Sequence, residues 1–154
     1  MSGTLFVDLD DTLLLPGRLS RSMWRIAKFF QNRGRARQQP NPAVVEAMRR
    51  YQRVVLVTSR DVADRERTLR LLEKHGIRIP EAQFCPRRDV FRDWKGRIIE
   101  ETAPVGAVDW MDDLFDPLGP TTLRRGPTGR ELRGLPVPGR AASGPPRPGE
   151  PPSL

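Results

Sequence analysis

Residues 5–14, with the sequence LFVDLDDTLL, constrain this chain more than any other segment. The apolar run at the start has the length and composition of one buried parallel strand, and it leads into the carboxylates Asp8, Asp10 and Asp11. Alternation along a strand sends the side chains of Asp8 and Asp10 to the same side. Carboxylates this close repel each other unless a cation lies between them or one of them holds a proton. The segment therefore favours a phosphoryl-transfer site assisted by Mg²⁺, and its alternative is a strand followed by an Asp-rich turn.

A second strand-like run ends in polar residues in the same way. The β-branched residues of the segment 54–57 are followed by Thr58, Ser59 and Arg60. A hydroxyl group at the end of a strand can donate to a phosphate oxygen, and a guanidinium group can add a charge-assisted contact. These residues are candidates for substrate binding, although Thr58 could equally satisfy its own backbone.

Two more candidates follow further along the chain. Lys95 lies just ahead of a helix-like stretch, and a strand expected over residues 105–111 ends in Asp112 and Asp113. Taken singly, Lys95 fits an exposed helix lysine, and the two aspartates could cap a turn. In an open α/β sheet, however, ligands bind outside the carboxyl ends of the strands. Asp8, Thr58 and the Asp112-Asp113 pair each follow the carboxyl end of an expected strand. We therefore expect them to form one site.

The other segments alternate between helix and strand patterns. We expect a short strand near Phe84 and helices over residues 20–31, 42–51, 62–75 and 91–101. This alternation predicts an α/β fold with a mainly parallel sheet covered on both faces and the first strand at its centre. We expect His75 to lie in the last turn of its helix, where a cation is favourable, and Cys85 to be a buried structural thiol.

These segments resemble, in order, the four motifs of the haloacid-dehalogenase superfamily of phosphohydrolases. The motifs here are Asp8-Leu9-Asp10-Asp11-Thr12, Thr58, Lys95 and Asp112-Asp113. The resemblance covers about residues 4–118. It implies a Rossmann-like three-layer α/β sandwich and a Mg²⁺-dependent phosphatase that acts through an aspartyl-phosphate.

The resemblance also implies individual roles. Asp8 would be the nucleophile and Asp10 the general acid and base, while Thr58 and Lys95 would neutralise the phosphoryl oxygens. The expected substrate-binding residues are Thr58, Ser59, Arg60 and Lys95. The expected metal ligands are Asp8, the backbone carbonyl oxygen of Asp10, and Asp112, with Asp113 or Asp116 in support.

The chain has little room for the cap domain with which many members of this superfamily cover small substrates. The missing cap and the Thr58-Ser59-Arg60 segment look most similar to the polynucleotide 3′-phosphatase and 5′-nucleotidase branches. An open site suits a phosphate on a large molecule, such as a nucleic-acid end or a phosphoprotein, and the resemblance favours a nucleotide or a nucleic-acid end among these. Seven cations without an intervening acid could guide such a polyanion, or could form a solvated helix face: Arg18, Arg21, Arg25, Lys28, Arg33, Arg35 and Arg37. The alternative function is a non-catalytic binding module of the same fold for nucleic acid or a protein partner.

Composition sets the expected limits of the folded part. From residue 117 onward Pro and Gly occupy 17 of 38 positions, which predicts a catalytic domain over residues 1–118 and a disordered tail over residues 119–154. The single cysteine excludes an internal disulfide. No apolar stretch is long enough for a membrane span, and the N-terminus leads directly into the first strand, so we expect a cytoplasmic protein without membrane contact.

Overall fold

The computed structural model describes residues 3–15, 38–86, 91–103, 108–113, 122–125 and 131–139, and only the backbone of residues 91–93, 122–125 and 131. The helix expected over residues 20–31, the seven cations between Arg18 and Arg37, and Asp116 lie outside this part of the chain.

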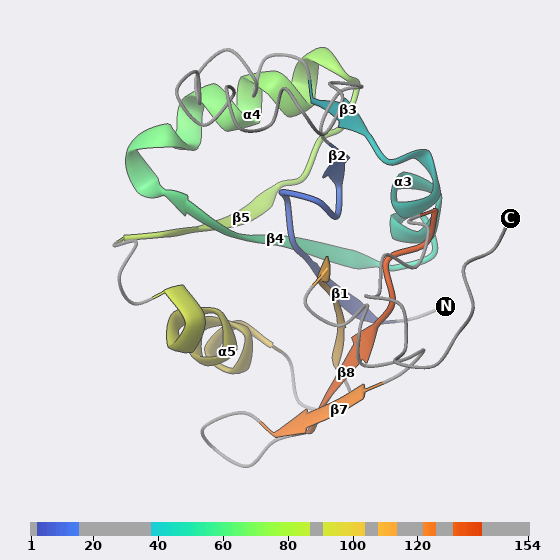
Figure 1. Cartoon of the computed structure of the whole chain (residues 1–154), viewed down its shortest axis with the longest axis vertical. Coiled ribbons are helices and arrows are strands. Elements are labelled where there is room, and N and C mark those ends of the chain that lie inside the picture. The colour runs from blue at the N-terminus through green and yellow to red at the C-terminus, as the bar shows by residue number, and fades with distance from the viewer. Residues whose placement is uncertain are drawn as a thin grey trace, which may run out of the picture.

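A six-stranded sheet forms the centre of the fold, in the spatial order β5-β4-β1-β6-β8-β7 (Figure 1). Its strands are β1 (Thr4–Val7), β4 (Arg53–Asp61), β5 (Glu81–Cys85), β6 (Val108–Met111), β7 (Thr122–Arg125) and β8 (Glu131–Leu135). Five neighbouring strands run parallel, and β7 pairs antiparallel with β8 at one edge. The predicted α/β class with a mainly parallel sheet is therefore confirmed, as is the central place of β1.

Strand β1 is buried on both faces, as its uninterrupted apolar run predicts. Leu5 and Val7 point into one hydrophobic cluster and Phe6 into another, and all three side chains are fully buried. This alternation follows from the two-residue period of a strand. The sheet therefore separates two cores.

Helices cover both faces of the sheet (Figure 1). On one face lie α3 (Pro42–Met48) and α4 (Arg65–Lys74), which is preceded by the 3₁₀ turn η1 (Val62–Asp64). On the other face lies α5 (Phe91–Thr102), whose Trp94 and Ile99 pack against Phe6. Trp94 and Cys85 are both buried in this second core, so each is a packing residue.

The start of α3 and the end of α4 lie where the sequence predicts them, whereas α3 ends at Met48 instead of residue 51 and α4 begins at Arg65, after the 3₁₀ turn. Asn41 caps α3 by accepting a hydrogen bond of 3.2 Å from the backbone N–H of Ala43, and Pro42 occupies the first turn. Helix α4 ends at His75, and Gly76 follows with φ of 73°, a left-handed conformation that glycine adopts without steric cost. His75 is thus a residue of the helix end, as expected.

A two-stranded antiparallel sheet joins β2 (Leu14–Leu15) to β3 (Gln39–Pro40). Leu14 is fully buried, and the backbone N–H of Asn41 donates to the carbonyl of Leu13 over 2.8 Å. This pairing brings Gln38 close to the loop that follows β1.

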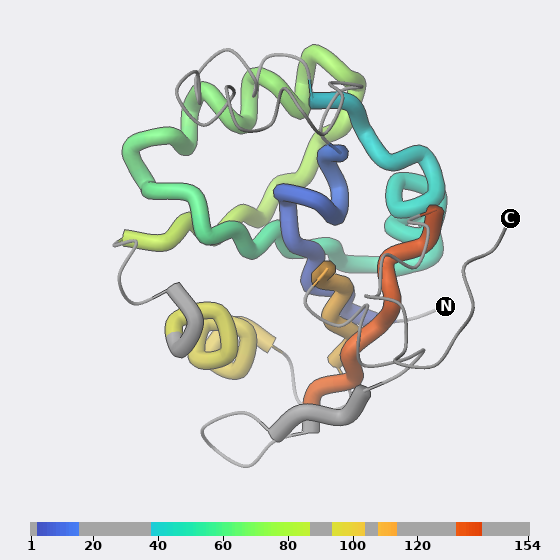
Figure 2. Tube along the Cα trace, in the orientation of Figure 1, coloured from blue at the N-terminus to red at the C-terminus, as the bar shows by residue number. Residues whose placement is uncertain are grey.

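The predicted domain boundary at residue 118 is not the end of the sheet. Strand β8 pairs parallel with β6, and the backbone of residues 132–139 continues from there toward α3 (Figure 2). Leu132 is 1% exposed in one core and Val137 is 4% exposed in the other. The average composition of residues 119–154 conceals this short segment, whose apolar side chains and backbone groups complete the open edge of β6.

An ion-paired cluster fixes β8 to the sheet. The guanidinium group of Arg133 donates to both carboxylate oxygens of Asp109 on β6, over 2.7 and 2.8 Å, and the hydroxyl of Tyr51 donates to Asp109 over 2.7 Å. Burial would raise the pKa of Asp109, but the hydrogen bonds from Arg133 and Tyr51 outweigh it and hold this pKa below its ordinary value. The carboxylate is therefore the shared acceptor that joins β6, β8 and the end of α3.

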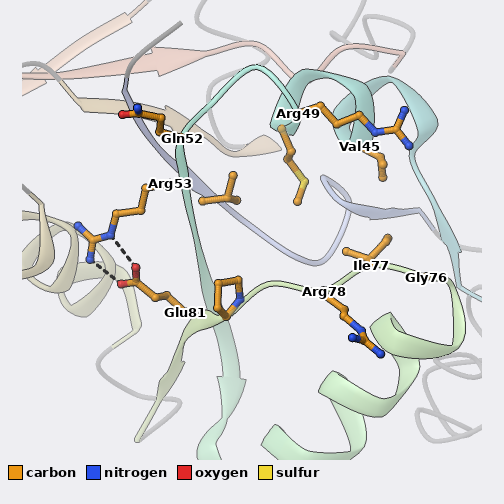
Figure 3. Close-up of a pocket in the computed structure, with 11 residues that line it drawn as sticks. Val45, Arg49, Gln52, Arg53, Gly76, Ile77, Arg78 and Glu81 are labelled. Atoms are coloured by element: carbon orange, nitrogen blue, oxygen red, sulfur yellow. Dashed lines mark hydrogen bonds and ion pairs between the residues drawn. The ribbon is translucent and has the colours of Figure 1, made fainter.

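A cavity of about 400 Å³ lies beside the amino ends of β4 and β5, between α3 and the segment after α4 (Figure 3). Arg53 and Glu81 bridge part of its wall through two hydrogen bonds of 2.7 and 2.5 Å. None of the predicted site residues lines this cavity. Within the described residues no helix is long and apolar enough to cross a membrane.

Truncation tests the contribution of β8. We expect a chain ending at residue 118 to unfold at a lower urea concentration than the full chain, because it loses the buried side chains of Leu132 and Val137. Burial of each is worth roughly 1.5–3 kcal/mol. A chain ending at residue 139 keeps both and is the matched control. Equal urea midpoints for the two truncated chains would contradict a structural role for β8.

Candidate active site

The candidate site lies at the carboxyl ends of three adjacent strands. Asp8 follows β1, Asp112 follows β6, and Thr58 lies in the last part of β4. The backbone N–H of Asp8 donates to the carbonyl of Met111 over 2.9 Å, so the pairing of β1 with β6 continues to the first site residue. The parallel sheet thus brings together residues more than 100 positions apart in the sequence, as predicted.

Lys95 and two carboxylates form the buried centre of the site. The Nζ atom of Lys95 lies 2.6 Å from Oδ1 of Asp8 and 3.0 Å from Oδ2 of Asp112. The three residues are 6%, 4% and 0% exposed, respectively. Lys95 reaches this point from α5, on the opposite face of the sheet from α4. The alternative of an exposed helix lysine is therefore excluded, because the ammonium group is buried and held between two carboxylates.

Three carboxylates at this centre could hold a metal ion. One carboxylate oxygen from each of Asp8, Asp112 and Asp113 lies within 4.8 Å of the others. Oxygen donors of this kind are the ligands that Mg²⁺ prefers. The side chain of Asp10, by contrast, is directed to Arg60, so any ligand from Asp10 would be its backbone carbonyl.

Burial and the neighbouring carboxylates both disfavour the charged form of Asp8. Burial raises the pKa of Asp8 to about 8 from its ordinary value of 3.8. Lys95 opposes that rise, while the negative charges of Asp112 and Asp113 add to it. Burial would lower the pKa of Lys95, but the attraction of Asp8 and Asp112 outweighs it and raises this pKa instead. The ammonium group therefore stays charged, and the carboxylates compete for it.

Thr12, the last residue of the first motif, connects Asp8 to Asp113. Its hydroxyl, fully buried, donates to Oδ2 of Asp8 over 3.4 Å and accepts from the backbone N–H of Asp113 over 3.0 Å. The tight turn between them includes Asp11 at φ of 62°, a conformation that aspartate tolerates better than most residues. The sequence feature that could have identified Thr12 is its position four residues after Asp8, because a tight turn between the two residues brings the hydroxyl back to that carboxylate.

The contacts of Thr58, Ser59 and Arg60, in the last part of β4, differ from the prediction. The hydroxyl of Thr58 is buried and accepts a hydrogen bond of 3.1 Å from the backbone N–H of Arg60. The side chain of Ser59 is half-buried and, by strand alternation, on the other side of the strand. The Arg60 side chain, predicted to bind substrate, is instead bound to Asp10. The structure thus joins Asp8, Lys95, Asp112 and Asp113 in one group, and Asp10 with Arg60 in a second.

A scan against protein families, a search of curated proteins and a search of solved structures each found no match to this chain.

The pKa of Asp8 predicts how the stability of the metal-free protein depends on pH. Because this pKa is raised in the folded state, its stabilising contribution is complete below about pH 4 and is lost as the pH rises toward 8. In a chelator, wild type should therefore lose stability relative to Asp8→Asn across this range, by up to about 1.4 kcal/mol per pH unit. Urea unfolding at a series of pH values measures the difference. A constant difference between the two proteins would contradict the raised pKa.

Proposed function

We propose that this protein is a Mg²⁺-dependent phosphatase of the haloacid-dehalogenase type, which hydrolyses phosphomonoesters through an aspartyl-phosphate. The observation that carries the proposal is the buried group of Lys95, Asp8 and Asp112, with Asp113 beside it, at the carboxyl edge of a parallel sheet. A purely structural ion pair would need one carboxylate for one ammonium group. Extra carboxylates in a buried position are unfavourable unless a cation or a charged ligand balances them.

Asp8 is the proposed nucleophile. Its carboxylate attacks phosphorus and forms an acyl phosphate as the bond to the leaving oxygen breaks. Lys95 lies 2.6 Å from Oδ1 of Asp8, close enough to attract a phosphoryl group that arrives there. The Thr12 hydroxyl, donating to Oδ2, helps to hold the plane of the carboxylate. Thr58, from the adjacent strand β4, is the proposed donor to a phosphoryl oxygen.

Asp10 is the proposed proton donor and acceptor. It gives a proton to the departing alkoxide oxygen, and it later removes a proton from the water that hydrolyses the acyl phosphate. Its side chain is directed away from the three-carboxylate group, which suits a residue that serves the leaving group instead of the metal.

The carboxylates fit a divalent cation. Asp8, Asp112 and Asp113 would hold it, and bound Mg²⁺ would supply positive charge that offsets the crowded carboxylates and the phosphate. The raised pKa of Asp8 shows that burial and the neighbouring carboxylates disfavour its charged form. A bound cation would favour that form and so offset the repulsion among the carboxylates.

Replacement of the nucleophile gives the first test. Asp8→Asn keeps the size of the side chain and removes its charge, so turnover of p-nitrophenyl phosphate should fall by at least about 1,000-fold. Glu81→Gln, which removes a carboxylate at the opposite end of the sheet, is the control and should retain activity. Full activity in a folded Asp8→Asn protein would exclude Asp8 as the nucleophile.

Metal removal gives the second test. We expect phosphatase activity to disappear in excess chelator and to return with Mg²⁺. Asp113→Asn should raise the Mg²⁺ concentration needed for half-maximal activity, since it weakens one ligand without removing the nucleophile. Activity that persists in chelator would reject the metal-dependent mechanism. Binding of nucleic acid or protein without any phosphatase activity would support the alternative of a non-catalytic module.

The substrate class is part of the proposal. A nucleotide or a nucleic-acid end suits the basic residues between Arg18 and Arg37, which lie outside the described part of the chain. If a 3′-phosphorylated oligonucleotide binds through three or four of these cations, raising salt from ~50 to ~200 mM should lower kcat/KM roughly 20- to 50-fold. A nucleoside monophosphate should respond much less. Equal, salt-independent efficiency on both substrates would indicate a small-molecule phosphatase.

A further inference from the structure

The side chain of Asp10 is held by a two-pronged contact from Arg60. The Nε atom of Arg60 donates to Oδ2 of Asp10 over 2.8 Å, and a terminal nitrogen donates to Oδ1 over 2.6 Å. Gln38 adds a third hydrogen bond, from its amide nitrogen to Oδ1 of Asp10 over 2.9 Å. A planar guanidinium group bound to both oxygens fixes the plane of a carboxylate as well as its position.

Arg60 is itself held in place from several directions. The terminal nitrogen that binds Asp10 also donates to the side-chain oxygen of Gln38 over 2.7 Å, and the other terminal nitrogen donates to the hydroxyl of Thr68 on α4 over 3.2 Å. The residue is only 5% exposed, while the Asp10 side chain is 38% exposed. The cation is therefore the buried and immobilised partner, and the carboxylate is the partner that reaches solvent.

The backbone of Arg60 is tied to the site as well. Its N–H donates to the hydroxyl of Thr58, two residues earlier on the same strand. Arg60 thus connects β4, α4 and the β2–β3 region to one carboxylate in the loop after β1. The Nε atom and one terminal nitrogen, which together could bind a phosphate in a two-pronged contact, are bound to Asp10 instead.

We infer that Arg60 is a positioning residue, which fixes the carboxyl group of Asp10 for proton transfer to and from the leaving oxygen. The inference rests on the proposed phosphatase function and deepens it. Proton transfer is efficient only when donor and acceptor are within hydrogen-bonding reach in the correct orientation. Arg60 supplies that orientation through the fork, and Gln38 supports it with its own hydrogen bond to Oδ1.

The test compares two substrates in the presence of Mg²⁺. The nitrophenolate group of p-nitrophenyl phosphate leaves without a proton, whereas the alkoxide of glycerol phosphate needs one. We expect Arg60→Lys to lower kcat for glycerol phosphate by about 100-fold, within the usual range for general acid catalysis. The same variant should lower kcat for p-nitrophenyl phosphate no more than about threefold, with KM nearly unchanged for both substrates. Lysine retains the charge and one hydrogen bond but cannot form the fork.

Two comparison variants define the effect. Arg53→Lys breaks the matching two-pronged contact with Glu81 at the other end of β4, and it should leave the ratio of the two activities unchanged. Asp10→Asn should show the same substrate dependence as Arg60→Lys, and the double variant should lose little more than Asp10→Asn. Gln38→Met, which leaves the fork intact, should give a smaller loss of several fold confined to glycerol phosphate. This variant carries the test if Arg60→Lys does not fold, as judged by circular dichroism.

Three results would overturn the inference. An increased KM for both substrates in Arg60→Lys would show that Arg60 binds the phosphate. An equal fall in kcat for both substrates in a folded variant would show a general structural role. Absence of Mg²⁺-dependent hydrolysis of either substrate by the wild-type protein would reject the proposed function itself, and with it the role of Arg60. The wild-type measurement therefore separates failure of the function from failure of the positioning role.

Discussion

The arrangement of the site depends on the backbone hydrogen bonds that pair β1 with β4 on one side and with β6 on the other. In this register Val7 lies opposite Leu56 and Met111, so the residues that follow emerge at one level of the sheet. The hydrogen bond from the Asp8 N–H to the Met111 carbonyl extends this register by one more residue. A slip by a single position would exchange the two faces of β1 and separate Asp8 from Asp112. The apolar side chains on both faces of β1 therefore determine the site geometry as much as the aspartates do.

The charges of the site impose a second constraint. Lys95 is brought to the sheet edge by α5, whose Trp94 and Ile99 pack into the core beneath it. This packing keeps the Lys95 side chain almost fully buried. Asp8 and Asp112 provide the negative charge that balances its ammonium group. Loss of Lys95 would leave the buried carboxylates of Asp8 and Asp112 without this ammonium group, and an uncompensated buried charge typically costs several kcal/mol. The excess of carboxylates that makes a cation favourable at this edge thus makes the local structure most sensitive to loss of the Lys95 ammonium group.

The sequence was sufficient to predict features that local patterns encode. The continuous apolar run of β1, the Asn41-Pro42 helix start and the acidic residues after β6 are all visible within a few positions, and they are confirmed. Three features depend on contacts that local patterns do not contain. Strand β8 forms because the edge of β6 lacks a neighbour, although the Pro- and Gly-rich composition around Leu132 suggests no strand. Arg60 binds Asp10 because three separate segments converge there, and Thr12 reaches Asp8 only through the turn at Asp11.

The two aspartates of the first motif have different partners, and this difference can assign them different tasks. Asp8 contacts an ammonium group in a buried position, next to other carboxylates, whereas Asp10 contacts a guanidinium group and remains partly exposed. An ammonium group is a compact charge that can be shared with an arriving phosphoryl group. A guanidinium fork instead imposes a direction on the carboxylate that it binds. In the proposed reaction the first arrangement suits the group that attacks phosphorus, and the second suits the group that must meet the leaving oxygen at a defined angle. The division of labour between two residues of the same type would then come from the cations that face them, and those cations are supplied by α5 and β4.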